Sequence, residues 1–441
     1  FIVLYILTNT HISHMEESIQ QIDMSLTAPL DVVLSETNKQ TPWEQFASPD
    51  PNSFLLNPPP LKWGILGTGR ICNDFTQALK LLPTAEVVAV ASRSSKEGAE
   101  RFGKKHGISR CYGTYEELCS DADVDIVYVG NVHLFRLPIC TLVLNSNKHC
   151  LLEKPMALSK KDAKDMINMA KGKGLFLGEG MWTRYFPAVE MVRELISNGE
   201  IGEVTNVASD FHFHSPDQEV YPSSPLYSRK LAGGAAMYLA SYPISAALCC
   251  FGQWPDKVVC NGIVDYDTEV DVEGGIIMRF PQFIGGGEVG MEEEGKEGND
   301  NAIEAAAPTQ TQTTQPSKDN ILKPKGGGMA CLHFGFLGES QEETTIVGTA
   351  GRIVIKGPCN CPTDISVMRK TPGSSRGSVE TSDFHFPLPT LTDEINESGG
   401  FYYPNSAGLA YEAAAVMRCV DRGETETPQY TMEEAMKVME I

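Results

Sequence analysis

The stretch LKWGILGTGRIC, residues 61–72, decides the fold. Residues 62–66 predict a buried strand, and the run after the turn predicts a helix. Between them, Gly67-Thr68-Gly69 matches the first two glycines of the dinucleotide-binding fingerprint, which let the backbone turn tightly and approach a pyrophosphate. Arg70 and Ile71 open the helix, whose N-terminus favours phosphate. Cys72 stands at the third glycine position, so the match is incomplete, and the alternative is a merely structural turn.

Strands and helices alternate after this turn. Apolar runs predict further strands at 86–91, 126–130, 149–152 and 175–178, and amphipathic runs predict helices at 71–82, 96–106, 134–145 and 159–171. Near-continuous apolar strands that alternate with helices are typical of a parallel, doubly wound sheet. We therefore predict an α/β fold with a Rossmann domain over residues 61–180.

The end of the second strand bears on the choice of cofactor. NAD sites usually place an acidic residue there to bind the ribose 2′-hydroxyl. This chain has Ser92-Arg93-Ser94 instead. Arginine supplies charge and planar donors to a 2′-phosphate, and serine supplies neutral donors. We predict NADP in preference to NAD; the alternative is that Arg93 is only a solvated loop residue.

The tripeptide Glu153-Lys154-Pro155 follows the strand at 149–152. A lysine at the mouth of a nucleotide-binding sheet can exchange a proton with a reacting oxygen, because partial desolvation moves its pKa toward working pH. Glu153 and Pro155 would fix the loop around it. The alternative is a surface lysine that ends a strand.

Four segments together resemble the glucose-fructose oxidoreductase/inositol dehydrogenase superfamily, and within it the dimeric dihydrodiol dehydrogenases, which also act as NADP-dependent D-xylose dehydrogenases. The resemblance covers residues 61–441 outside the insertion described below. The segments are Gly67-Thr68-Gly69, Gly130-Asn131-Val132-His133, Glu153-Lys154-Pro155 and the run WTRYFP at 182–187.

The resemblance implies a second domain over 181–441, built on an open, mostly antiparallel sheet whose face forms a homodimer. It places Lys154 beside the nicotinamide, and Asn131 and His133 at the cofactor. It makes Trp182 and Arg184 the substrate-side walls, and Tyr242 the catalytic tyrosine. Tyr238 stands at the substrate position where the family has an aspartate. For Tyr242, a helix-core tyrosine is the alternative.

The composition of the chain bears on its partners, its compartment and the presence of a metal. A net charge of −21 argues against a nucleic-acid partner. Twelve cysteines, several in apolar runs, fit a reducing, cytoplasmic compartment rather than a disulfide framework. Neither Cys359-Asn360-Cys361 nor the pair His212 and His214 has the spacing of a metal site, so we predict no metal.

Two segments are predicted to be disordered: a proline-rich leader at 1–60 and an acidic, glycine-rich insertion at 285–328. The strand-like runs at 275–280 and 329–337 flank the insertion, which would replace a hairpin turn. The apolar run at 1–7 is too short to span a membrane. The chain begins with Phe1, so we expect a gene-model extension or a targeting leader. It ends within a helical pattern at 431–440, so a further C-terminal piece is expected.

Two functions remain. The first is an NADP-dependent dehydrogenase of a vicinal diol or cyclic sugar hydroxyl, in which Lys154 and Tyr242 handle the proton. The second is a non-catalytic, nucleotide-binding regulatory protein of the same superfamily, which the missing aspartate at Tyr238 and the acidic insertion would favour.

Overall fold

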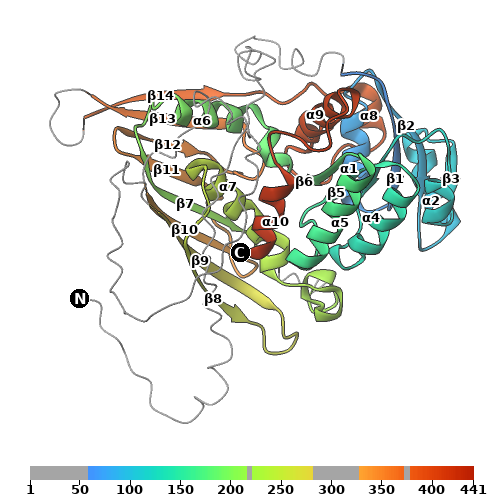
Figure 1. Cartoon of the computed structure of the whole chain (residues 1–441), viewed down its shortest axis with the longest axis horizontal. Helices are drawn as coiled ribbons and strands as arrows, with labels where there is room; N and C mark the ends of the chain where they lie inside the picture. The colour runs from blue at the N-terminus through green and yellow to red at the C-terminus, as the bar shows by residue number, and fades with distance from the viewer. Residues whose placement is uncertain (1–57, 216–220, 282–326, 372–377) are drawn as a thin grey trace, which may run out of the picture.

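The computed structural model describes residues 58–215, 221–281, 327–371 and 378–441. These residues form two sheets, each with its own helices (Figure 1). The predicted leader, apart from residues 58–60, and the predicted insertion, apart from residues 327–328, lie outside the described residues.

The first sheet is the predicted Rossmann sheet. Its six strands are all parallel and lie in the order β3-β2-β1-β4-β5-β6. The order reverses between β1 and β4, and ligands of such sheets bind outside the carboxyl ends of the strands at this point. The strands are β1 (Leu61–Leu66), β2 (Ala85–Ala91), β3 (Arg110–Tyr112), β4 (Ile126–Val129), β5 (His149–Glu153) and β6 (Leu177–Gly180).

The helices of this domain start and stop at capping residues. The Ser95 side chain accepts a hydrogen bond from the Gly98 N–H and opens one helix, which ends at the left-handed Gly107. Ser159 opens another in the same way. The helical elements are α1 (Arg70–Leu79), α2 (Lys96–His106), α3 (Tyr115–Cys119), η3 (His133–Phe135), α4 (Arg136–Asn145) and α5 (Lys160–Lys173).

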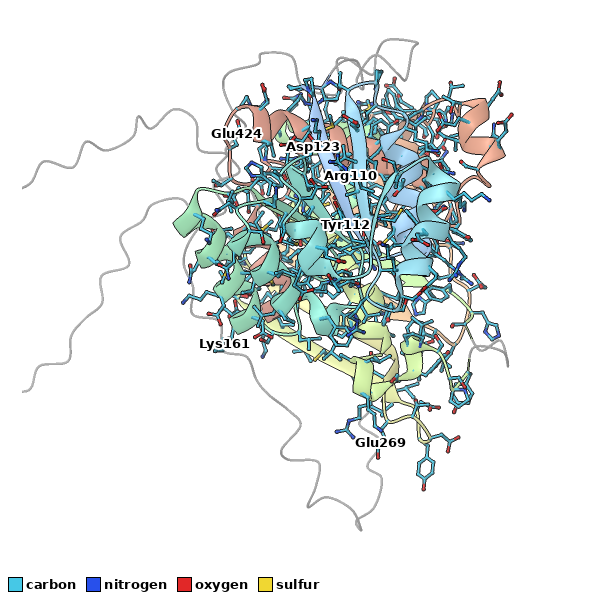
Figure 2. All side chains as sticks on the ribbon, turned by 90° about the vertical axis from the view of Figure 1, so that its right-hand side faces the viewer. Arg110, Tyr112, Asp123, Lys161, Glu269 and Glu424 are labelled. Atoms are coloured by element: carbon cyan, nitrogen blue, oxygen red, sulfur yellow. The ribbon has the colours of Figure 1, made fainter. Side chains whose placement is uncertain are left out.

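Strand β3, which the sequence analysis did not predict, forms the edge of the sheet. Arg110 on this strand makes an ion pair with Asp123, and the Tyr112 hydroxyl donates a hydrogen bond to Asp121 over 3.0 Å (Figure 2). The strand has only three residues. It is therefore held by its side chains as well as by its pairing with β2.

Cys72, at the third glycine position, packs against Gly130 at the end of β4. Its sulfur lies 3.6 Å from the Gly130 carbonyl oxygen and 3.8 Å from that of Leu66. A Cβ added to Gly130 would lie only 2.3 Å from this sulfur. The larger residue at 72 is thus accommodated because its neighbour at 130 has no side chain.

We expect Gly130→Ala to destabilise the fold by about 1 to 3 kcal/mol, the usual cost of overpacking. The double variant Gly130→Ala, Cys72→Ala removes the sulfur and should regain most of the loss. Thermal unfolding of the two single variants and the double variant measures this coupling. Losses that simply add would contradict the packing described here.

The second sheet has eight strands in the order β14-β13-β12-β11-β7-β10-β9-β8, antiparallel except for the β7–β10 pair. Val207, Ile346 and Ile353 point to its inner face and are fully buried. As predicted, the runs on either side of the insertion pair, with Phe280 opposite Gly328. The strands are β7 (Val204–His212), β8 (Lys257–Val264), β9 (Asp271–Phe280), β10 (Gly328–Gly335), β11 (Thr344–Gly348), β12 (Gly351–Ile355), β13 (Asp364–Lys370) and β14 (Val379–His385).

Helices cover the inner face of this sheet and then return to the first domain. Helix α7 packs on β7, β10 and β11, α9 packs on α1, and α10 lies between α5 and α7 (Figure 1). The helical elements are η4 (Trp182–Tyr185), α6 (Pro187–Ser197), η5 (Pro225–Tyr227), η6 (Arg229–Leu231), the π-helix η7 (Ala236–Ala240), α7 (Ser241–Phe251), α8 (Asp393–Glu397), η8 (Ser406–Gly408), α9 (Leu409–Asp421) and α10 (Met432–Glu440).

One helical stretch, Arg229–Phe251, is long and apolar enough to pass as a membrane span. However, 67% of its apolar window is buried inside the protein, where it forms part of the core. This extent of burial is typical of a helix that packs in the core of a protein.

Candidate active site

The glycine turn lies at the carboxyl end of β1, beside the ends of β2 and β4. Gly67 adopts a φ of +112°, which favours glycine, and its N–H donates to the Ala91 carbonyl. Gly69 precedes α1 without any side-chain cap, and a Cβ added there would meet nothing within 4 Å. The backbone at Gly69 is therefore open, which leaves room for a pyrophosphate at the N-terminus of α1. Thr68 and Ile71 beside them are half-buried, and Arg70 is exposed.

The residues predicted to bind the 2′-phosphate of the ribose lie at the end of β2. Ser92 is buried, and its hydroxyl lies 2.9 Å from that of Ser94. Arg93 is exposed, and its guanidinium carbon lies 4.2 Å from the centre of the Phe135 ring. Phe135 comes from the loop after β4 and was not predicted. It holds the arginine by a cation–π contact at the edge of the crevice.

Lys154 follows β5, and its side chain reaches the second domain. Its ammonium donates to the Tyr238 main-chain carbonyl over 2.6 Å and lies 4.3 Å from the centre of the Tyr242 ring. Burial lowers the pKa of Lys154 to about 8; the charge of Glu153 opposes this shift and that of Arg136 reinforces it. The side chain can therefore lose and regain a proton close to neutral pH.

Three buried ionisable groups hold the loop that carries this lysine. Glu153 accepts from the Lys154 N–H over 3.2 Å and from the Tyr128 hydroxyl over 2.7 Å. Glu179, on β6, accepts from the Met156 N–H over 3.1 Å. Burial raises the pKa of Glu179 to about 8. The Lys154 backbone is thus fixed from two sides.

The third group is Arg136, which joins two loops of the site. Its guanidinium donates to the Pro155 carbonyl and, over 3.1 Å and 3.3 Å, to the Asn131 carbonyl. The Asn131 side chain in turn donates to the Tyr115 hydroxyl over 2.6 Å. Asn131 therefore lies at the crevice, as a residue of the loop after β4.

Tyr238 lies in the π-helix η7, and Tyr242 lies in the first turn of α7, which follows η7 directly. Pro243 has no backbone N–H, so an α-helical hydrogen-bond pattern cannot run through this segment. The π-helix directly before it presents the Tyr238 carbonyl to Lys154. A main-chain oxygen thus anchors the lysine, whatever side chain stands at position 238.

Tyr242 is buried, and its hydroxyl accepts a hydrogen bond from the Trp182 indole over 3.1 Å. Burial, with Glu153 as a further cause, raises the pKa of Tyr242 well above its usual range. The phenol therefore stays protonated. Trp182 donates to the phenol oxygen, so the phenol's own proton remains free to be donated to another group.

His133 sits on the other side of Tyr238, with ring centres 5.2 Å apart. Burial lowers the pKa of His133 to about 4, and its Nε2 lies 2.6 Å from the Ala232 carbonyl. A carbonyl can only accept, so Nε2 carries the proton of the neutral ring. His133 joins the cofactor loop to the second domain.

Arg184, predicted as a wall of the substrate site, lies with Tyr242 along one small pocket. It is buried in an ion pair with Glu434 of α10 and donates to the Ser245 hydroxyl over 3.1 Å. The nearby Trp182 indole donates a hydrogen bond to Tyr242, whereas the Arg184 guanidinium is paired with Glu434. The ion pair thus holds α10 against η4, and the role of Arg184 toward a substrate stays a prediction.

Sequence reasoning missed Glu179 and did not assign Arg136. Glu179 lies between two glycines, which hide the strand pattern, and the strand itself lies two residues beyond its predicted range. An isolated arginine in an apolar helix was the only signal for Arg136. In the part of the chain that the structure describes, no cluster of three His, Cys, Asp or Glu residues could hold a metal ion.

A nucleotide turn at the switch point of a Rossmann sheet, with a lysine of lowered pKa opposite it, defines a class: nicotinamide-dependent oxidoreductases. Residues 61–181 match the family model for oxidoreductases with an NAD-binding Rossmann fold, and residues 189–311 match the GFO/IDH/MocA C-terminal domain. The chain belongs to the GFO/IDH/MocA oxidoreductase family.

Individual relatives agree with this assignment. The chain is 32% identical to the trans-1,2-dihydrobenzene-1,2-diol dehydrogenase of Danio rerio and 28% identical to that of Homo sapiens, in each case over 86% of this chain and 94% of the relative. Among solved structures, a levoglucosan dehydrogenase with NADH and levoglucosan superimposes with a TM-score of 0.65 at 14% identity, over 86% of this chain and 95% of the other. A 3-ketoreductase from Actinomadura kijaniata with NADP gives 0.60 at 20% identity, over 86% and 95%. These two structures share the fold.

Proposed function

We propose that this chain is an NADP-dependent dehydrogenase that oxidises a vicinal diol, such as a trans-dihydrodiol, or a cyclic sugar hydroxyl of the D-xylose type. The observation that carries the proposal is the position of Lys154, which lies at the carboxyl end of β5 with its amine between the Tyr238 carbonyl and the Tyr242 ring. The named activity of the Danio rerio and Homo sapiens relatives supports the substrate class.

In this mechanism the two side chains divide the proton work according to their pKa values. The neutral amine of Lys154 takes the proton of the substrate hydroxyl, and Tyr242, which stays protonated, donates a hydrogen bond to the same oxygen. A bound nicotinamide would supply the acceptor for the hydride that leaves the carbon bearing this hydroxyl group. Trp182 holds the Tyr242 hydroxyl in place.

The test is turnover by the purified chain with NADP or NAD and a panel of trans-dihydrodiols, pentoses and hexoses, followed through the absorbance of the reduced nicotinamide. We expect reduction that is faster with NADP. NADP binding with no turnover on any member of the panel would favour the regulatory protein instead. Absence of binding to either nucleotide would refute both.

The preference for NADP rests on Arg93. We expect Arg93→Ala to raise KM for NADP by about 10- to 100-fold, because a charged hydrogen bond to the 2′-phosphate contributes about 1.5 to 3 kcal/mol. KM for NAD, which has no 2′-phosphate, should hardly change. Steady-state kinetics with both cofactors decide the point, and an equal effect on the two would count against a 2′-phosphate contact.

We further propose a homodimer that forms through the outer face of the second sheet. Val259, Ile277, Cys331 and Ala208 are paired in turn across β8, β9, β10 and β7, so their side chains share a face. Val259 is 54% exposed and Ile277 46% exposed, and the row carries no charge. An uncharged, exposed row on a sheet favours contact with a second copy.

Ile277→Lys places a charge in this row and should give a monomer in size-exclusion chromatography with light scattering. Leu391→Lys is the matched control, because Leu391 is 39% exposed but lies outside the sheet. A wild-type monomer, or a dimer that survives the substitution, would refute this interface.

A further inference from the structure

A segment of the second domain, residues 399–406, is fastened to the helix that follows the glycine turn. Asp74 of α1 is fully buried and accepts from the Tyr402 N–H over 2.8 Å, the Tyr403 N–H over 2.9 Å and the Ser406 hydroxyl over 2.8 Å. The Gln77 side chain adds a hydrogen bond to Gly400. A buried carboxylate with three such donors fixes the backbone of the segment firmly.

This attachment brings two tyrosines to the start of α1. Arg70 lies one helical turn before Asp74, on the same face of the helix. Its guanidinium carbon is 6.0 Å from the centre of the Tyr402 ring, and the Lys105 amine is 5.3 Å from that centre. Arg70 also lies close enough to the Tyr403 phenol to lower its pKa. Tyr402 is 57% exposed and Tyr403 44% exposed, although their backbones are held rigidly.

Tyr403 also lies within electrostatic reach of the catalytic end of the crevice. Partial burial raises the pKa of its phenol; the charge of Arg70 opposes this shift, and the carboxylates of Asp74 and Glu153 add to it. Tyr403 is also among the groups that raise the pKa of Tyr238, whose carbonyl accepts from Lys154. The phenol is thus near Arg70 at the glycine turn and near Glu153 and Tyr238 at the proton-transfer site.

A dinucleotide bound from the glycine turn at the end of β1 to Lys154 at the end of β5 would extend along the carboxyl edge of the first sheet. We propose that Tyr403 is a cofactor-positioning residue, whose ring packs on the pyrophosphate and nicotinamide-ribose half of the bound dinucleotide. Asp74 is the anchor that holds it there, and the second domain thereby closes the cofactor crevice. This inference rests on the proposed function only in requiring that a nicotinamide dinucleotide binds at the glycine turn.

The experiment compares NADPH affinity, by fluorescence titration of the full chain, among wild type, Tyr403→Ala, Tyr403→Phe and the control Tyr266→Ala. Tyr266 lies in the turn after β8 and is 94% exposed. Tyr403→Ala should weaken NADPH binding by about tenfold, the scale of losing one aromatic packing partner. Tyr403→Phe keeps the ring and should stay close to wild type, as should Tyr266→Ala.

Thermal unfolding without cofactor separates packing on the ligand from stability of the fold. The Tyr403 ring is partly exposed, so Tm of Tyr403→Ala without NADPH should match that of the wild type, and only the increase in Tm on adding NADPH should shrink. Wild-type affinity in Tyr403→Ala, or an equal loss in Tyr403→Phe, would overturn the packing role. If the wild type binds neither NADPH nor NADH, it is the proposed function that fails.

Discussion

Lys154→Met is expected to lower kcat for alcohol oxidation by about 10³-fold, within the range that general acid–base groups contribute. Methionine fills similar space but has no proton acceptor. Affinity for NADPH should remain, because the glycine turn is unchanged. Rates measured at saturating substrate, together with NADPH titration, test this. Lys161→Met is the control, because Lys161 projects from the surface of α5 and pairs only with the partly exposed Asp165 (Figure 2).

The proposed role of Lys154 also predicts the direction in which the rate changes with pH. Oxidation requires the neutral amine of Lys154, whose fraction rises as pH increases through its pKa of about 8. The wild-type rate of oxidation should therefore rise across this range, and the reverse reduction, which needs the ammonium, should fall. The residual activity of Lys154→Met should show neither trend. Full turnover by this variant would refute the lysine mechanism.

Tyr242→Phe is expected to lower kcat by about 10²-fold, because the substrate oxygen loses a hydrogen-bond donor while the base remains. The substitution also leaves the Trp182 indole N–H without its acceptor, at a cost of about 1 to 3 kcal/mol. A fall in Tm should accompany the lower rate. Kinetics and thermal unfolding of the same preparation measure both effects.

The pH profile distinguishes the two roles. The phenol of Tyr242 stays protonated far above neutral pH, so removing it should keep the rise of oxidation with pH that Lys154 produces. Trp182→Phe is the matched variant: it retains the Tyr242 hydroxyl and should lose much less activity. Loss of the rise with pH in Tyr242→Phe would show that the tyrosine, rather than the lysine, is the base.

The features that could be predicted are those marked by a few neighbouring residues in the sequence. Helix α2 has the predicted range, because Ser95 and Gly107 mark its ends within a few residues of sequence. The glycine turn and Lys154 were found because each directly follows an apolar strand. The edge strand β3 was missed because three residues carry no periodicity.

The rest of the site depends on contacts between residues far apart in the chain. Glu179 holds the Lys154 loop from the neighbouring strand, and Arg184 pairs with Glu434 across 250 positions. Nothing near Arg184 in the sequence indicates whether it meets a substrate or a carboxylate. Burial, which sets the pKa values of Lys154 and Glu179, is likewise a property of the folded chain.

The attachment of residues 399–406 to Asp74 also bears on how the protein is made. The first domain ends its sheet at Gly180, yet its buried Asp74 finds its hydrogen-bond donors more than 300 positions later. During synthesis this carboxylate would have to remain hydrated until those residues have left the ribosome. The nucleotide crevice would then be completed late in translation, and the Rossmann domain expressed by itself would lack part of its own wall.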